Sequence, residues 1–456
     1  MFRIAIILTA GLSSLALCKP LSLSEVLQSV RDRYPLLEGA RKDVESAQGE
    51  VRFSEGAFDI QWRTRAGSTL LGYYENKTVD SVLEQPMTLW GASLFAGYRL
   101  GIGDFPIYDG KMVTNPAGEL RAGLAIPIWR DGPLDRRRAN IQKATLGLTV
   151  ADLQVLQQRI ESIRTATHRY WDWVSASLKV KIYQELLRIA EERDKGLKER
   201  VKAGDLPEFE RRDNERAILQ RKSQLVSAER SLQQATIELS LFWRDTQGNP
   251  VLAGEEHMGS VIPLPDKTAE PKESVEEALQ KRPEVKRFEI LKAQNAIERD
   301  LASNQAGPRI DVQLQAAKSI QPGDPTRNDP RLDAGIVLEI PLQANIAGGR
   351  EDSAIATGMR LELQERFLRD KIATELWDSR SALNAAALRS DLTHRETELA
   401  RKLEQGERIR FRQGDSNQLF VNIREQATAD AAVREVEALA EYQKNLATLK
   451  AVLGEG

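Results

Sequence analysis

The sequence predicts an α+β fold built from two internal repeats, each with a helix, a pair of strands and a long helical hairpin. The first observation is an apolar run containing proline that occurs twice, at 124–129 and at 338–342. The second is a Gly-Asp pair that follows each run, at 204–205 and at 414–415. The spacing from run to pair differs between the copies by about one helical turn. Matching order and spacing indicate an internal duplication.

The composition is typical of long helices that share a thin core. Charged residues make up 29% of the chain and are almost balanced, with 65 Lys and Arg against 67 Asp and Glu, while aromatic residues make up only 6%. Long tracts rich in Ala, Leu, Glu, Arg, Lys and Gln favour extended helices. The net charge of -2 gives no support to a nucleic-acid partner, which requires a basic stripe.

Residues 1–18 are predicted to be a signal peptide, because a charged start precedes an apolar run and small residues. Cleavage before Leu17 and cleavage before Lys19 both suit the pattern. Cys18 is the only cysteine, so no disulfide is expected. Lipidation of Cys18 remains open but is disfavoured, because the residue before it is Leu17 and not a small one. The sequence after residue 18 has no run of eighteen consecutive apolar residues, so no membrane-spanning helix is predicted.

The helical pattern repeats in both halves. The first repeat, 19–245, has a helix to about 56, a long helix at 134–202 and a returning helix at 208–245. The second repeat, 273–456, has the corresponding helices at 283–305, 348–411 and 417–453. In each repeat the two shorter helices together match the length of the long one, which predicts columns of an extended antiparallel bundle. A proline-rich linker, 246–272, joins the repeats.

Strands are expected between the first and the long helix of each repeat. Ile310, Val312 and Leu314 alternate with Asp311 and Gln313. This pattern fits a transmembrane barrel strand with lipid on one side and water on the other. A half-buried strand of a soluble sheet shows the same alternation.

The other strands are expected at 58–63, 120–129 and 332–342, and a long excursion at 68–119 contains one more alternating run, at 94–100. Four or five strands cannot close a barrel, and open edges cannot stand in lipid. The chain is therefore expected to be an oligomer.

Taken together, these features resemble the TolC-like outer-membrane efflux protein family, also called outer membrane factors. The resemblance is carried by the prolines of the two apolar runs, the Gly-rich entries to the long helices, the Trp-Asp pairs at 171–172 and 377–378, and the tip glycines. It implies a homotrimer in which each protomer lends four strands to one twelve-stranded outer-membrane barrel and its helices form a periplasmic tunnel. It also implies a passive exit duct of a tripartite efflux or type I secretion system, with a periplasmic adaptor protein and an inner-membrane transporter as partners.

The two hairpin tips hold the candidate site residues. Gly204 and Gly414 are expected to end their helices with a positive φ. The resemblance implies that the tips meet the adaptor, which makes contact candidates of four further residues, Asp205, Leu206, Asp415 and Ser416.

The resemblance also places acids that face the tunnel just beyond each tip. The first repeat keeps them as Glu210 and Asp213, whereas the second has Phe420 and Ile423. This departure puts an acidic gate in doubt. An apolar constriction at Phe420 and packing of Phe420 between neighbouring helices both remain open.

No catalytic, metal or cofactor site is predicted, and an enzyme is the least favoured class. His168, His257 and His394 lie far apart, and none has another metal ligand one helical turn away. Glu-Arg runs such as 191–193 are interpreted as solvated helix faces. The alternative function is a secreted or surface-attached helical coiled-coil structural protein, which would need sustained heptads and no strand pairs. A periplasmic adaptor would usually have one long hairpin and not two.

Overall fold

The computed structural model describes residues 20–258, 261–265 and 274–455. The predicted signal peptide, with Cys18, lies outside the described residues, as does part of the linker. The chain divides into two compact units. A helical unit comprises Met1–Glu38, Gln157–Arg282 and Ile372–Gly456, and a sheet unit comprises Gly39–Leu156 and Pro283–Lys371.

Both repeats begin in the same way. The helices α1 (Leu23–Arg33) and α5 (Val275–Lys281) each start at a serine, Ser22 or Ser274, whose side chain accepts a hydrogen bond from the backbone of a glutamate three residues later. The glutamate side chain in turn accepts from the serine backbone, so each start is a complete capping box. The next helices, α2 (Pro35–Glu55) and α6 (Pro283–Ala306), begin at a proline, which suits the first helical position.

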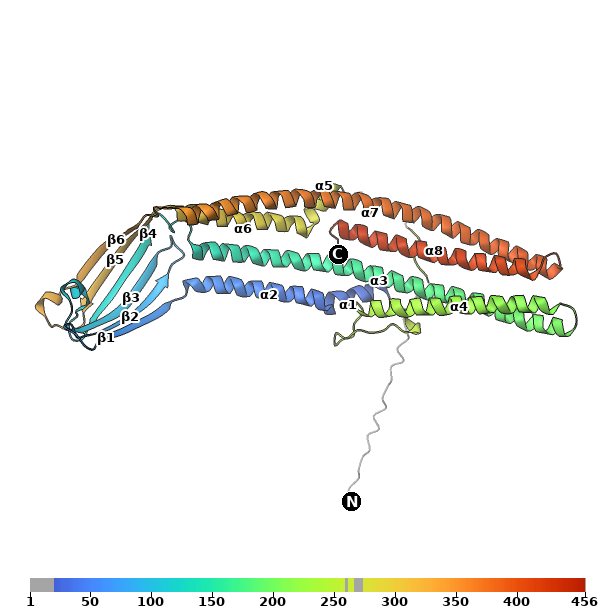
Figure 1. The fold of residues 1–456 in the computed structure, drawn as a ribbon, viewed down its shortest axis with the longest axis horizontal. Coiled ribbons are helices and arrows are strands. Elements are labelled where there is room, and N and C mark those ends of the chain that lie inside the picture. The colour runs from blue at the N-terminus through green and yellow to red at the C-terminus, as the bar shows by residue number, and fades with distance from the viewer. Residues whose placement is uncertain (1–19, 259–260, 266–273, 456) are drawn as a thin grey trace, which may run out of the picture. The chain divides into compact units, whose positions relative to one another are not determined.

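Six strands form one antiparallel sheet, in the order in which they occur along the chain. Figure 1 shows them side by side from β1 to β6. Their bounds are β1 Gln61–Thr69, β2 Asn76–Pro86, β3 Ser93–Gly103, β4 Glu119–Pro127, β5 Arg309–Ser319 and β6 Arg331–Glu339. The first repeat thus contributes four strands and the second contributes two.

The α+β fold of two repeats is confirmed, but the expected count of four strands for each protomer is corrected to six. The excursion at 68–119 holds the β2–β3 hairpin, which lies between β1 and β4. The sequence of β2 gave little signal, because Asp80 and Glu84 interrupt its apolar character. Pairing stabilises it instead, since β2 is matched with β3 over its whole length, from Asn76 opposite Gly103 to Pro86 opposite Ser93.

The sheet has one apolar face and one charged face. Residues directly opposite each other in neighbouring strands share a face, so the register places one residue of every strand in a single row. The row on the apolar face is Trp62, Leu83, Ala96, Ala122, Ala316 and Leu332. The rows on either side add Leu94, Leu120, Leu124, Ile126, Val312, Leu314 and Ile336. This face is largely exposed; Trp62 and Leu332, for example, are about three-quarters exposed.

Ion pairs cover the opposite face. Arg121 pairs with Asp80, and Arg99 lies 3.8 Å from Asp80 and 3.7 Å from Glu119. Arg331 of β6 also reaches Glu119, at 3.7 Å. These pairs link four of the six strands, including both strands of the β2–β3 hairpin. The hairpin therefore has the same two-sided character as the rest of the sheet.

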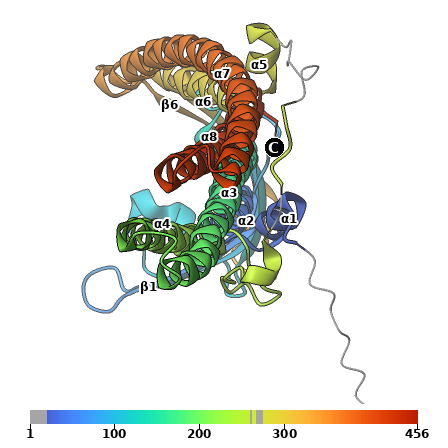
Figure 2. The same ribbon diagram turned by 90° about the vertical axis from the view of Figure 1, so that its right-hand side faces the viewer.

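Two long helical hairpins follow the strand pairs. The first joins α3 (Arg136–Lys202) to α4 (Glu208–Ser240), and the second joins α7 (Asn345–Gln413) to α8 (Gln418–Val452). Figure 2 looks onto the hairpin ends, where the green α3–α4 pair lies beside the red α7–α8 pair. None of the helices in the described part of the chain combines the length and apolar character needed to cross a membrane.

The core of the helical unit lies where α1, α3 and α4 meet. Trp173 is fully buried there together with Val26, Val30 and Leu239. Tyr170 anchors the start of the described chain, because its hydroxyl donates to the carbonyl oxygen of Leu21 at 3.0 Å. The Trp-Asp pairs of the two repeats are not equivalent in burial, since Trp171 is 7% exposed and Trp377 is 62% exposed.

Candidate functional site

The two hairpin tips have the same backbone geometry. Gly204 and Gly414 have φ of 79° and 85°, the left-handed region that favours glycine. Each glycine N–H donates to the carbonyl of Val201 or Phe411, and the following aspartate N–H donates to the carbonyl of Arg200 or Arg410. This is a Schellman motif, and it satisfies carbonyls that the helix end leaves unpaired. The role predicted for both glycines is thus the one they have.

The tip carboxylates point to solvent. Asp205 and Asp415 are exposed, and within the described part of the chain neither side chain forms an ion pair or a hydrogen bond. Leu206 and Ser416 are partly buried. The Ser416 hydroxyl is held by Glu407, and the Asn417 side chain caps α8 by accepting from the Phe420 backbone at 3.1 Å. The second tip is thus fixed by side chains, whereas the first tip has Pro207 at its helix start without a side-chain cap.

The residues just beyond the tips differ between the repeats, as the sequence indicated. In α4, Glu210 is partly exposed, and Asp213 lies 3.3 Å from Arg216 one turn later. In α8, Phe420 and Ile423 lie one turn apart on the same face, 53% and 50% exposed. About half of each side chain is exposed and presents an apolar surface to its surroundings.

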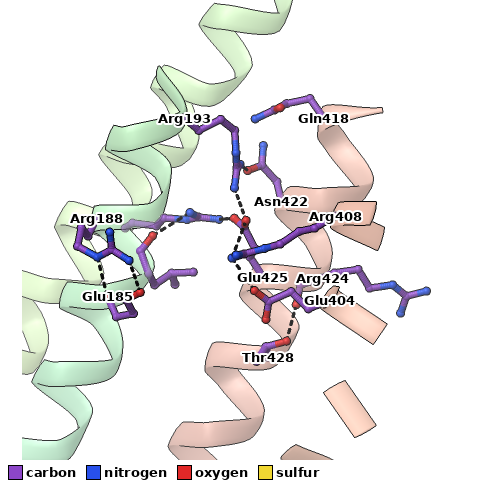
Figure 3. Close-up of polar contacts among 12 residues, drawn as sticks. Glu185, Arg188, Arg193, Glu404, Arg408, Gln418, Asn422, Arg424, Glu425 and Thr428 are labelled. Atoms are coloured by element: carbon purple, nitrogen blue, oxygen red, sulfur yellow. Dashed lines mark hydrogen bonds and ion pairs between the residues drawn. The ribbon is translucent and has the colours of Figure 1, made fainter. Parts of the chain in front are cut away.

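A buried carboxylate near the tips joins the two hairpins, and no pattern in the sequence indicates it. Glu425 of α8 is 1% exposed in its side chain and receives three guanidinium groups. Arg221 of α4 lies 3.0 Å away. Arg408 of α7 lies 3.1 Å away, and Arg193 of α3 contacts the same carboxylate (Figure 3). All four helices of the two hairpins meet at this one group.

We call the side chains of Glu425, Arg193, Arg221 and Arg408 the Glu425 cluster. Further contacts around them complete the polar network. Arg193 also donates to the side-chain oxygen of Asn422, and Arg221 donates to the carbonyl of Leu186 at 2.9 Å. Burial, the largest effect, lowers the pKa of Arg221 below its usual value; arginine nevertheless stays charged in proteins. Three cations therefore meet at one buried anion, and one of them, Arg408, also pairs with Glu404 at 2.6 Å.

The interpretation of 191–193 as a solvated face was wrong for Arg193, whose side chain is only 14% exposed. In the sequence, Glu425 follows Arg424 in one more Glu-Arg pattern among many. Only the packing of α8 against α3 and α4 separates it from the exposed pairs. The spacing of charged residues along the chain does not distinguish a single buried glutamate from the exposed ones.

All three histidines lie in the helical unit and are partly buried, and two of them, His168 and His394, have partners on another helix. His394 lies 2.6 Å from Glu435, and this hydrogen bond raises the pKa of His394 above its usual value. His168 lies 3.0 Å from the Thr448 hydroxyl, and burial lowers the pKa of His168. In the described residues, no group of three or more His, Cys, Asp or Glu side chains is arranged to hold a metal ion.

The chain matches no family model and no curated protein, but it is similar to solved structures of outer-membrane proteins. It superposes on the channel OprN with a TM-score of 0.70 and 15% identity, covering 95% of this chain and 90% of that one. For the outer-membrane protein VceC of Vibrio cholerae the TM-score is 0.69 and the identity 14%, with 95% and 96% covered. For the MtrE outer-membrane channel of Neisseria gonorrhoeae the TM-score is 0.67 and the identity 16%, with 95% and 89% covered.

Proposed function

We propose that this chain, whose fold is that of the TolC-like outer-membrane channels, is an exit duct in the outer membrane of a Gram-negative-type envelope. In this proposal it serves a tripartite efflux or type I secretion system. It carries out no reaction and holds no cofactor. Small molecules, metal ions or proteins pass through it passively, after an inner-membrane pump has delivered them.

The observation that carries the proposal is the two-sided sheet. Its strands have 9 or 11 residues, the length that a tilted strand needs to span the hydrocarbon layer. One face is apolar and exposed across all six strands, and the other is lined with ion pairs. A sheet of a soluble protein would cover its apolar face, whereas lipid can cover this one.

The proposed duct is a homotrimer that works with a periplasmic adaptor protein. The hairpin tips are the proposed docking surface, because Asp205 and Asp415 are exposed on turns that backbone hydrogen bonds hold, and neither carboxylate has a partner among the described residues. Three copies would present a ring of carboxylates to basic side chains of the adaptor. The half-exposed Phe420 and Ile423 lie near this ring and are the proposed apolar constriction.

The test is the location and the permeability of the full chain. After expression in a Gram-negative-type host, the protein should sediment with the outer membrane in a density gradient. Purified and reconstituted in liposomes, it should pass ions in discrete channel events. Recovery from the culture medium in a form without affinity for lipid would overturn the proposal and favour a secreted helical structural protein.

A further inference from the structure

We infer that the β2–β3 hairpin is part of the membrane wall, so that the sheet edges β1 and β6 of neighbouring copies pair and three chains close a barrel of eighteen strands. This inference rests on the proposed function, and it fixes the number of strands and the seam between copies. The partner is a second copy of this chain.

The β2–β3 hairpin has the features of barrel strands and not those of a surface loop. Leu83 of β2 and Ala96 of β3 stand in one row with Trp62 of β1 and Ala122 of β4, on the apolar face. On the other face, Asp80 and Arg99 of the same hairpin join the ion-pair network through Arg121 and Glu119. A loop outside the barrel wall would not need an apolar face and a charged face that continue those of the neighbouring strands.

The two edges suit each other. β1 and β6 both have nine residues, and all the strands of the sheet are antiparallel to their neighbours. Because the number of strands in one chain is even, β6 of one copy runs antiparallel to β1 of the next. On the charged face, β1 has Arg63 and Arg65, while β6 has Asp333 and Glu339 together with Arg331. The seam therefore places two carboxylates of β6 on the same face as two arginines of β1.

The membrane makes this pairing necessary. Among the residues that the structure describes, the outward N–H and C=O groups of β1 and β6 have no partner strand, and unpaired backbone groups in hydrocarbon cost several kcal/mol each. Six strands are too few to close a barrel alone. Barrel diameter grows roughly in proportion to strand number, so eighteen strands enclose a lumen about half as wide again as twelve. A barrel of this size has room for an aqueous channel.

The seam is tested by disulfide scanning in outer-membrane vesicles. Ala66→Cys of β1 is combined in turn with Cys at four apolar-face positions of β6, Leu332, Ala334, Ile336 and Leu338. A matched set uses Cys at the charged-face positions Asp333, Gly335 and Val337. We expect at least one apolar-face pair to give an oxidation ladder that ends at three chains, and no charged-face pair to do so. The wild-type chain and Ala66→Cys alone are the controls for unspecific linking.

The strand count is tested within one chain. Ala96→Cys with Ala122→Cys should form an intrachain disulfide, because these residues are directly opposite in β3 and β4. Trp62→Cys with Ala122→Cys should not, although it would if the β2–β3 hairpin stood outside the wall and β1 met β4. The inference is overturned if the Trp62–Ala122 pair forms the intrachain disulfide and the Ala96–Ala122 pair does not. It is also overturned if the oxidation ladder between copies ends at two chains, or if charged-face and apolar-face pairs link equally. Since the protein is assayed only after recovery from the outer membrane, absence from that membrane would instead refute the proposed function.

Discussion

At the scale of single residues, Glu425 is the group whose charge matters most. Replacing it by glutamine leaves Arg221, 2% exposed in its side chain, without a counter-ion. Breaking a buried ion pair from one side costs about 3–5 kcal/mol, so Glu425→Gln should markedly lower the thermal midpoint of the helical signal in circular dichroism. The matched control is Glu185→Gln, which removes an exposed partner of Arg188 and should change little.

A double-mutant cycle separates the charge effect from a packing effect. Glu425→Gln combined with Arg221→Gln removes both buried charges, and it should cost less than the sum of the single changes. Additive costs would mean that the Glu425 cluster stabilises the hairpins by shape alone.

His394 gives a dependence on pH with a defined sign. Its pKa in the folded protein is raised, mainly by the hydrogen bond with Glu435 and also by the charge of Glu398, while Arg401 opposes the shift. A raised pKa stabilises the fold fully below the unfolded value near 6.5 and loses this contribution as the pH rises through the folded value. The loss of thermal midpoint caused by His394→Gln should therefore be larger at pH 5.5 than at pH 9. An equal loss at both values would show that the protonated histidine makes no special contact.

At the scale of elements, substitutions in the strand β5 test which face of the sheet contacts lipid and which contacts water. Val312 lies between Ile126 and Ile336 on the apolar face, and Gln313 lies between Ala125 and Gly335 on the other. Val312→Lys places a charge in lipid, at a cost of about 2–4 kcal/mol near the bilayer centre, and should impair assembly. Gln313→Lys should be mild. Trimer yield after outer-membrane extraction measures both, and equal damage would argue against a lipid-facing side.

At the scale of the whole molecule, the two tips together form the proposed docking surface. One exposed ion pair contributes under about 1 kcal/mol, so docking through Asp205 and Asp415 has to be collective and should weaken with salt. The double variant Asp205→Arg with Asp415→Arg should abolish export and leave trimer yield and outer-membrane insertion unchanged. Both changes lie on exposed turn positions, so folding is not expected to suffer. Export at the full rate in the double variant would place the docking surface elsewhere.

The sequence by itself determined the repeats, the helix ends and most of the strands, because these follow from local chemistry. The serines before α1 and α5, the prolines that open α2 and α6 and the tip glycines act within a few residues of chain. The alternation in β5 likewise showed its two faces directly, with Ile310 and Val312 on one and Asp311 on the other.

Only the tertiary structure decided the strand count and the Glu425 cluster. The strand β2 is defined by pairing with β1 and β3 and not by its own weak pattern. Arg193, Arg221 and Arg408 come from three helices and meet Glu425 from a fourth, over separations along the chain at which charge spacing has no meaning. Burial depends on which helix faces pack together. Trp171 and Trp377 occupy corresponding places in the two repeats, yet the first is buried and the second exposed, so residue identity alone does not determine burial.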